Sequence, residues 1–205
     1  MCSTNVNVHR DSDSPSTPMC GYPLFRAGAK HGYRALMTDL SVENVLEHPS
    51  VRRVAAALAS FGVRGQITVL DDAARTAQQA AEALGIETAQ IANSLVFRAH
   101  RKDKTIRPLL VLTSGIHRVD TIKVADLLEL TEVSLADAEF VREHTGFAIG
   151  GVAPVALLHP VETVVDISLS RYDQVWAAAG HPHTVFPTSY DELLRLTGGH
   201  PAEVA

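Results

Sequence analysis

Apolar residues along the chain recur at two spacings, one typical of helices and one typical of strands. Between 51 and 61 they return every three or four positions and Gly62 follows, which predicts a helix that ends there. The same spacing at 77–84 predicts a second helix, which Asp72 or Thr76 can cap. Further helices are expected at 121–128, at 135–144 and between Ser189 and Gly198.

Short apolar runs bounded by turn residues predict the strands. The charged stretch 98–107 is expected to be the loop of a hairpin, and the run 175–179 also fits a helix. Several strands follow one another directly, which favours an α/β fold with a mixed sheet over a doubly wound parallel one. The expected strands are 66–70, 91–97, 108–113, 129–134, 155–158, 162–167, 175–179 and 181–186.

The first 36 or so residues show neither spacing. The stretch 11–18 is polar and rich in turn residues, so it cannot bury enough apolar surface to become ordered. We expect a poorly ordered extension over 1–45 and one compact domain over 46–205. Met37 is a candidate for the natural first residue, and the intact mass of the natively expressed protein tests that hypothesis.

Composition narrows the classes of partner. The 205 residues are 46% apolar and 20% charged, as in globular proteins. A net charge of -5 and only 5% aromatic residues argue against a DNA-binding protein and against wide stacking platforms. No apolar run is long enough to span a bilayer, and Cys2 and Cys20 form no disulfide framework. A cytoplasmic protein that contacts neither DNA nor membrane is expected.

A glycine-rich segment at 145–154 interrupts the regular elements. Gly150 and Gly151 allow a ligand to lie against the main chain, and Pro154 stiffens the segment that follows. Two interpretations are open. The segment is either a tight turn between two elements or a loop that presents free N–H and C=O groups to a small ligand.

Sequence motifs for nucleotide binding and for serine hydrolases are absent. The chain contains no GxxxxGK[ST], no GxGxxG and no GxSxG. Ser114 lies close to His117 along the chain, but neighbouring positions rarely face each other as nucleophile and base. Arg75, Arg118 and Lys123 adjoin loops, where they can contact phosphate or can simply be solvated.

His181 and His183 would point to the same face of a strand. Such a pair could hold zinc if His159, His117 or Asp166 supplied a third ligand, or it could line a cleft through hydrogen bonds alone. The chain has no HExxH motif and no suitable cysteines, so the second interpretation is favoured and no metal or other cofactor is expected.

Three motifs in succession resemble the YbaK/EbsC family, the free-standing relatives of the editing domain of bacterial prolyl-tRNA synthetase. The motifs are ANSLVF at 92–97, LTSGIHRVD at 112–120, and TGF at 145–147 leading into GGVAP at 150–154. The resemblance extends over about 49–199. It implies a single compact α/β domain with a curved, barrel-like mixed sheet surrounded by helices, and hydrolysis of the ester between a wrong amino acid and tRNA.

The implied chemistry explains why glycines would line the site. A synthetase pocket rejects a slightly different amino acid by only about 1–3 kcal/mol, so a second site must remove errors. In the family the GxxxP loop, here 150–154, would supply backbone donors of the oxyanion-hole type. A side-chain nucleophile is not required if the terminal ribose hydroxyl of the tRNA helps to activate a water molecule.

One position departs from the family pattern. A lysine usually occupies the position of Asn93, which can form hydrogen bonds but cannot attract phosphate as a charge. Arg75, Arg118 or the histidine pair could compensate, the substrate could differ, or hydrolysis could have been lost. The many polar residues at loop positions favour a working variant of the site.

The resemblance therefore implies a trans-editing aminoacyl-tRNA deacylase, which exists as a monomer or homodimer. The single-stranded CCA end of a mischarged tRNA is the expected ligand and an aminoacyl-tRNA synthetase is a possible partner. The alternative is a family member that binds aminoacyl-tRNA, an amino acid or a synthetase without hydrolysis. The implied catalytic residues are Asn93, Gly150 and Gly151, and the implied substrate-binding residues are Arg75, Thr76, Ser114, His117, Arg118, Pro154 and His183.

Overall fold

The structure, a computed structural model, describes residues 44–63 and 65–205. Nearly all of the extension predicted over 1–45 lies outside these residues, so its boundary stays a prediction. None of the described helices is long and apolar enough to cross a membrane. The helices are α2 (Pro49–Ser60), α3 (Ala77–Leu84), α4 (Thr121–Leu127), α5 (Ala138–Thr145) and α6 (Tyr190–Thr197), with the 3₁₀ helices η1 (Thr88–Gln90) and η2 (Ile167–Arg171).

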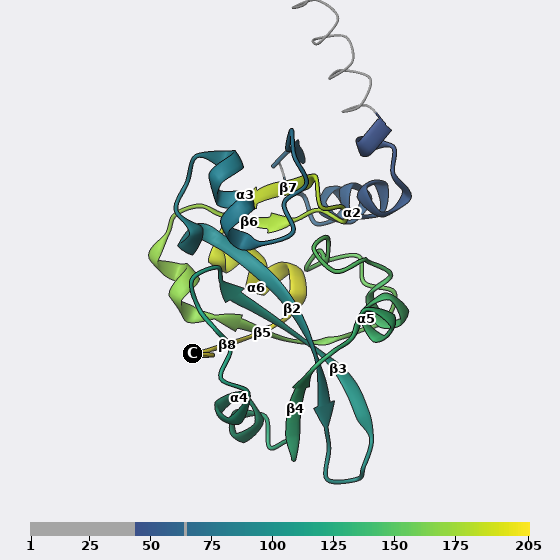
Figure 1. Cartoon of the computed structure of the whole chain (residues 1–205), viewed down its shortest axis with the longest axis vertical. Coiled ribbons are helices and arrows are strands. Elements are labelled where there is room, and N and C mark those ends of the chain that lie inside the picture. Colours follow the sequence, from purple (N-terminus) through teal and green to yellow (C-terminus); the bar gives the residue numbers. More distant parts are fainter. Residues whose placement is uncertain (1–43, 64) are drawn as a thin grey trace, which may run out of the picture.

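Strands from the whole described chain join in one mixed sheet, and the helices lie around it (Figure 1). Its order is β1-β7-β6-β2-β3-β5-β8, and β4 pairs with β2 beside this path. The pairs β2–β6, β3–β5 and β5–β8 are parallel and the others are antiparallel. The predicted α/β class with a mixed sheet is confirmed. The strands are β1 (Thr68–Val69), β2 (Ile91–His100), β3 (Ile106–Ser114), β4 (Glu132–Leu135), β5 (Glu162–Asp166), β6 (Val175–Ala178), β7 (Thr184–Thr188) and β8 (His200–Ala202).

The β2–β3 hairpin crosses the middle of the molecule and is covered on both faces. Leu110 and Leu112 pack into one apolar cluster, whereas Leu109 and Val111 pack into another, because side chains alternate along a strand. All four side chains are fully buried. The hairpin is therefore a rigid support for the residues at the start of β2.

Helix ends agree with the signals in the sequence. The Thr76 side chain, and not that of Asp72, caps α3 by accepting a hydrogen bond from the Gln79 N–H. Asp120 and Ser189 cap α4 and α6 in the same way. These capping interactions are local, which is why sequence alone predicts them.

Two predicted segments in the middle of the chain differ in the structure. The run 155–158 is not a strand but an irregular stretch, which is buried at Val155 and exposed at Leu158. The hairpin loop is shorter than 98–107 because β2 continues to His100 and β3 begins at Ile106. Arg98 lies within the strand opposite Pro108 and Ser134, and its side chain forms an ion pair with Asp137 at 2.7 Å, which a charge count along the sequence cannot show.

The C-terminal part contains the other two differences. The prediction of a strand from 181 was wrong, because His181–His183 form a turn and β7 begins at Thr184. β8 was missed, since it is short and contains Pro201. It pairs with β5 at the edge of the sheet, where a proline is tolerated.

Candidate active site

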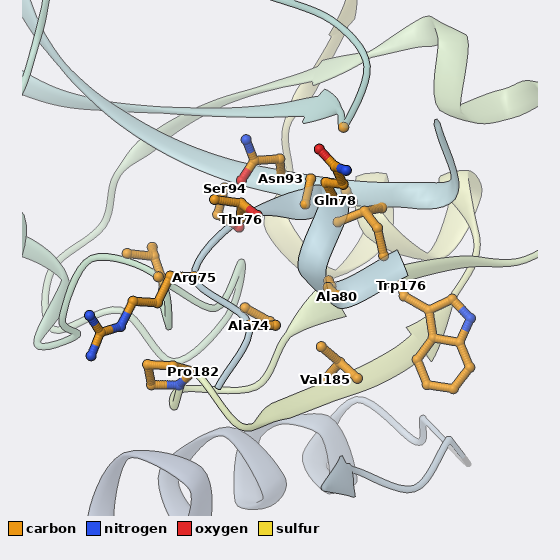
Figure 2. Close-up of a pocket in the computed structure, with 18 of the residues that line it drawn as sticks. Ala74, Arg75, Thr76, Gln78, Ala80, Asn93, Ser94, Trp176, Pro182 and Val185 are labelled. Carbon is orange, nitrogen blue, oxygen red and sulfur yellow. The ribbon is translucent and has the colours of Figure 1, made fainter. Parts of the chain in front are cut away.

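A pocket lies where the parallel pairing of β2 with β6 ends. The two strands share only the pairs Ile91–Trp176 and Ala92–Ala177. Residues of both strands at and after these pairs line a cavity of about 430 Å³ (Figure 2). This volume falls within the range of small-molecule sites, about 300–1,000 Å³. The remaining walls come from the residues before and in α3, from the glycine-rich segment and from β7.

Four of the predicted site residues meet in this pocket. Arg75, Thr76, Asn93 and Gly150 all line it, although they come from three separate parts of the chain. The Arg75 backbone is held by its N–H, which donates to Gln79 Oε1 at 2.9 Å. The Arg75 side chain is exposed and reaches away from β2 in Figure 2, where Asn93 and Thr76 lie close together.

Gly150 brings the glycine-rich segment against the loop before α3. Its φ of +87° lies in the region that favours glycine, and a Cβ there would stand 3.4 Å from Arg75 Cα. Its N–H meets no acceptor among the described residues, whereas the Gly151 N–H donates to the Ala148 carbonyl at 3.0 Å. Gly150 is therefore a residue of the pocket wall whose amide has no acceptor among the described residues.

Ser94 is a lining residue that sequence reasoning did not single out. Its Oγ is buried and has no hydrogen-bond partner among the described residues. Buried polar groups in native proteins nearly always have a partner, because an unpaired one costs about 1–3 kcal/mol. The only signal in the sequence is its place beside Asn93 in the ANSLVF motif.

The glycine-rich segment is anchored from α2. The Arg53 guanidinium lies 4.5 Å from the centre of the Phe147 ring, and its Nη2 donates to the Thr145 carbonyl at 3.2 Å. Burial lowers the pKa of Arg53, although a guanidinium stays protonated in proteins. Gly151 and Pro154 are buried behind the pocket wall, and a Cβ on Gly151 would stand 3.0 Å from His181 Cα. Both residues support the loop and do not line the cavity.

Three histidine rings lie close together, and His181 among them adjoins Gly151. The rings of His181 and His183 are 5.5 Å apart between centroids, and the His48 ring is 5.1 Å from that of His181. Burial lowers the pKa of His181, and His48 and His183 lower it further. His183 Nδ1 lies 3.0 Å from the Leu70 carbonyl oxygen, and His183 does not line the pocket. In the described chain no three His, Cys, Asp or Glu side chains could hold a metal ion, which gives the zinc alternative no support.

Three further predicted residues, Ser114, His117 and Arg118, lie outside the first pocket. His117 Nδ1 lies 2.7 Å from Asp166 Oδ2, and both line a second pocket with η2 and the C-terminal residues. Burial alone would raise the pKa of Asp166, but hydrogen bonds from the Ser168 and Ser114 amides and from His117 lower it below its usual range. The Ser114 hydroxyl donates to the Ala89 carbonyl, and Arg118 is exposed in the same loop. None of these three lines the first pocket.

Every residue that lines the first pocket falls within 74–185. A model of the family described as the aminoacyl-tRNA editing domain matches residues 71–196 and so contains the whole pocket. The chain belongs to the aminoacyl-tRNA editing domain family. The resemblance to YbaK-like proteins seen in the three sequence motifs is thereby confirmed.

Individual relatives of this editing domain agree with the family match. The uncharacterized protein YwhH of Bacillus subtilis is 31% identical over 148 residues, which are 72% of this chain and 91% of YwhH. A proline–tRNA ligase of Limosilactobacillus fermentum is 33% identical over 93 residues, 45% of this chain but only 16% of the ligase. The chain thus corresponds to a small part of that synthetase.

Solved structures share the fold. One, proposed to be a trans-editing enzyme for prolyl-tRNA synthetase, has a TM-score of 0.69 and 41% identity over 76% of this chain and 96% of its own. Another, a hypothetical protein, has a TM-score of 0.68 and 28% identity over 74% and 98% of the two chains. The editing domain here therefore has the size of a free-standing protein of this fold.

Proposed function

We propose that this editing domain is a trans-acting deacylase, which hydrolyses the ester of a mischarged tRNA in the pocket between β2 and β6. The observation that carries the proposal is the buried, unpaired hydroxyl of Ser94 beside Asn93 and the Gly150 N–H in one cavity. These are neutral hydrogen-bonding groups, as binding of an ester requires. Working in the cytoplasm, the domain would act on tRNA after its release from a synthetase.

Hydrolysis in such a site proceeds through attack of water on the ester carbonyl carbon. The carbonyl oxygen becomes an oxyanion, which the Gly150 N–H can stabilise because it has no other acceptor. The bond from that carbon to the ribose oxygen then breaks, and the ribose oxygen takes the proton that the water loses. The products are the free amino acid and uncharged tRNA, and no side-chain nucleophile is consumed.

Asn93 and Ser94 would position the substrate. The two residues are neighbours on β2 and both line this cavity. Asn93 can donate to one group and accept from another, which suits the ester and the terminal ribose. Ser94 would offer its unpaired hydroxyl to the substrate.

Arg75 would replace the charge that Asn93 lacks. Its exposed guanidinium stands at the rim of the pocket, and a guanidinium binds phosphate in a fixed, bidentate geometry. The phosphates of the CCA end are the expected partners. Arg118, in contrast, is in the loop of the second pocket and would contact the tRNA only outside the reaction site.

A deacylation panel tests the proposal. Purified protein is mixed with proline, threonine, valine and isoleucine tRNAs that carry alanine, serine, cysteine or threonine. Release faster than the spontaneous rate is expected for at least one non-cognate pair, and Asn93→Ala should slow it by about 10- to 100-fold. Spontaneous rates across the whole panel would contradict the proposal.

A second function, binding without turnover, is favoured by one observation, the neutral Asn93 at a position where the family pattern has lysine. The variant Asn93→Lys separates the two. If the natural chain is inactive and the variant hydrolyses, the natural chain is a binding protein. If the variant loses an existing activity, the natural site is a divergent enzyme.

A further inference from the structure

One part of the pocket is apolar and includes the single tryptophan of the chain. Trp176 lines the cavity and is half-buried. In Figure 2 it lies at the end of the pocket occupied by Val185 and Ala80, opposite the end from which Arg75 extends. No charged side chain is among the lining residues at the tryptophan end, where Ala80, Ile91, Ala178 and Val185 accompany it.

The backbone of Trp176 is fixed on both sides. It pairs with Ile91 of β2 and with Pro187 of β7. Side chains alternate along β6, so Trp176 and Ala178 share one face, while Val175 and Ala177 point into the main core. The ring also packs with the cluster beneath α3. An aromatic surface held in this way needs little ordering when a ligand binds.

The small side chains around the ring leave space for a flat group. Ala80 and Ala178 extend only to Cβ and both line the cavity beside Trp176. A tryptophan that merely filled the core would be enclosed, whereas this one contributes to the wall of a pocket. A flat aromatic ring suits a wall of this kind, because its face can pack on Trp176 without meeting a charged side chain.

We propose that Trp176 stacks against the terminal adenine base of the tRNA. This inference rests on the proposed function, because the substrate is then an amino acid esterified to adenosine. That ligand has polar ester and ribose groups at one end and a flat base at the other. The pocket has the same division, with Asn93 and Ser94 at one end and Trp176 at the other.

Stacking on an aromatic side chain is a substantial contribution for a single base. Loss of such a platform weakens binding by about 5- to 150-fold per base. The low aromatic content of the chain predicts that no extended platform exists, but one terminal base requires only one ring. Trp176 would contact the last nucleotide alone.

The fluorescence of Trp176 provides a direct test, because no other tryptophan contributes to the signal. The protein is titrated with uncharged tRNA that ends in CCA and with the same tRNA trimmed to end in CC. Binding of each is measured separately by filter retention, so that signals are compared at equal occupancy. The CCA form should quench the fluorescence and the CC form should not. Equal signals from the two forms would overturn the inference.

Free adenine nucleotides could present the same base, so a third titration uses adenosine monophosphate. Quenching by the tRNA that exceeds quenching by equimolar nucleotide supports recognition of the tRNA end. Quenching by the free nucleotide without any response to CCA-tRNA would assign the site to a nucleotide and overturn the inference.

Variants of Trp176 test whether its ring contributes to affinity for the CCA form alone, an effect that a purely structural role would not produce. Trp176→Phe retains a ring and should keep most of the affinity for CCA-tRNA, whereas Trp176→Leu should weaken it by about 5- to 150-fold with little effect on binding of the CC form. Phe61→Leu is the matched control, since Phe61 is an exposed aromatic residue outside the pocket. If Trp176→Leu fails to fold, the comparison of CCA with CC on the natural protein still decides.

The outcomes separate this inference from the proposed function. Deacylation with equal quenching by both tRNA forms would leave the enzyme in place and remove the adenine site. Quenching that depends on the terminal adenine, without deacylation of any substrate, would leave the base site in place and remove the catalytic proposal.

Discussion

The loop between β3 and α4 contributes to two pockets, which use their polar groups in opposite ways. Gly115 lines the first pocket and His117 lines the second. In the second, Asp166 accepts hydrogen bonds from Thr113, Ser114, His117 and Ser168. In the first, the Ser94 hydroxyl and the Gly150 N–H have no partner within the described residues.

The His117–Asp166 pair looks more like catalytic machinery, yet its carboxylate is already satisfied by the protein. Such a carboxylate stabilises the loop that begins at Ser114, because removing it would leave several buried donors unpaired. The Ser94 hydroxyl and the Gly150 N–H of the first pocket form no such stabilising hydrogen bond within the described residues. Unused hydrogen-bonding capacity, more than the presence of ionisable residues, distinguishes a candidate site from a structural one.

The largest expected effect comes from Asp166→Ala. The substitution leaves four hydrogen-bond donors without their acceptor and should lower the free energy of unfolding by about 3 kcal/mol. Urea denaturation measures the change, and Asp173→Ala is the control because that carboxylate is exposed. A variant of natural stability that no longer deacylates would reverse the comparison and give the second pocket the function.

Ser94→Ala should lower the rate of deacylation and leave the stability intact, the opposite of the effect expected for Asp166→Ala. The rate of deacylation should fall by about 5- to 150-fold, because a substrate contact of about 1–3 kcal/mol is lost. Stability should be unchanged or slightly higher, since an unpaired buried hydroxyl is removed. Ser60→Ala, at an exposed hydroxyl that bonds to the Ala57 carbonyl, should change neither quantity. Loss of stability without loss of rate would show that Ser94 is structural.

Gly150→Ala tests whether the backbone at Gly150 contributes to the first pocket. An alanine at a φ of +87° is strained by about 1–2 kcal/mol, and its Cβ would stand close to Arg75. Both the melting temperature and the deacylation rate should fall, the rate by more than the fraction of unfolded protein explains. Gly62→Ala is a suitable control, because its φ is also positive but its Cβ meets no neighbour. Equal effects of the two substitutions on the rate would contradict a role for Gly150 in the site.

The smallest effect concerns pH. The pKa of His181 is lower in the folded chain than in the unfolded one, because burial, His48 and His183 disfavour its charged form. The unfolded state therefore binds more protons below about pH 6.5, and stability should fall as the pH drops through that value towards the folded pKa. The slope for one such group is at most about 1.4 kcal/mol per pH unit. Urea denaturation between about pH 7.5 and pH 5.5 measures it, and His181→Gln should flatten the curve.

Much of the fold could be predicted because its signals are local. The caps at Thr76, Asp120 and Ser189 and the turn at Gly62 depend on residues only a few positions away. The strand predicted over 155–158 failed because no strand pairs with this apolar run, of which only Val155 is buried and Leu158 is exposed. An apolar run alone does not determine β structure, because a strand also needs a neighbouring strand with which to form hydrogen bonds.

The site could be predicted only in part. Asn93 and Gly150 were found through motifs. The predicted Ser114 and His117 instead form hydrogen bonds with the Ala89 carbonyl and with Asp166, outside the first pocket. Trp176 was missed because it enters the pocket through a parallel pairing with Ile91, which is distant in sequence. Long-range pairing leaves no periodic signal, so the wall that β6 contributes is visible only in the folded chain.

The contact from Arg53 to the glycine-rich segment has a consequence for where the working unit begins. Arg53 lies in α2, upstream of the matched family region 71–196. A fragment cut at 71 would retain every pocket-lining residue but would lose the guanidinium that contacts Phe147 and the Thr145 carbonyl. Transplanting this editing domain into another protein therefore requires the segment from α2 onward, because the contact that supports the glycine-rich segment begins outside the matched region.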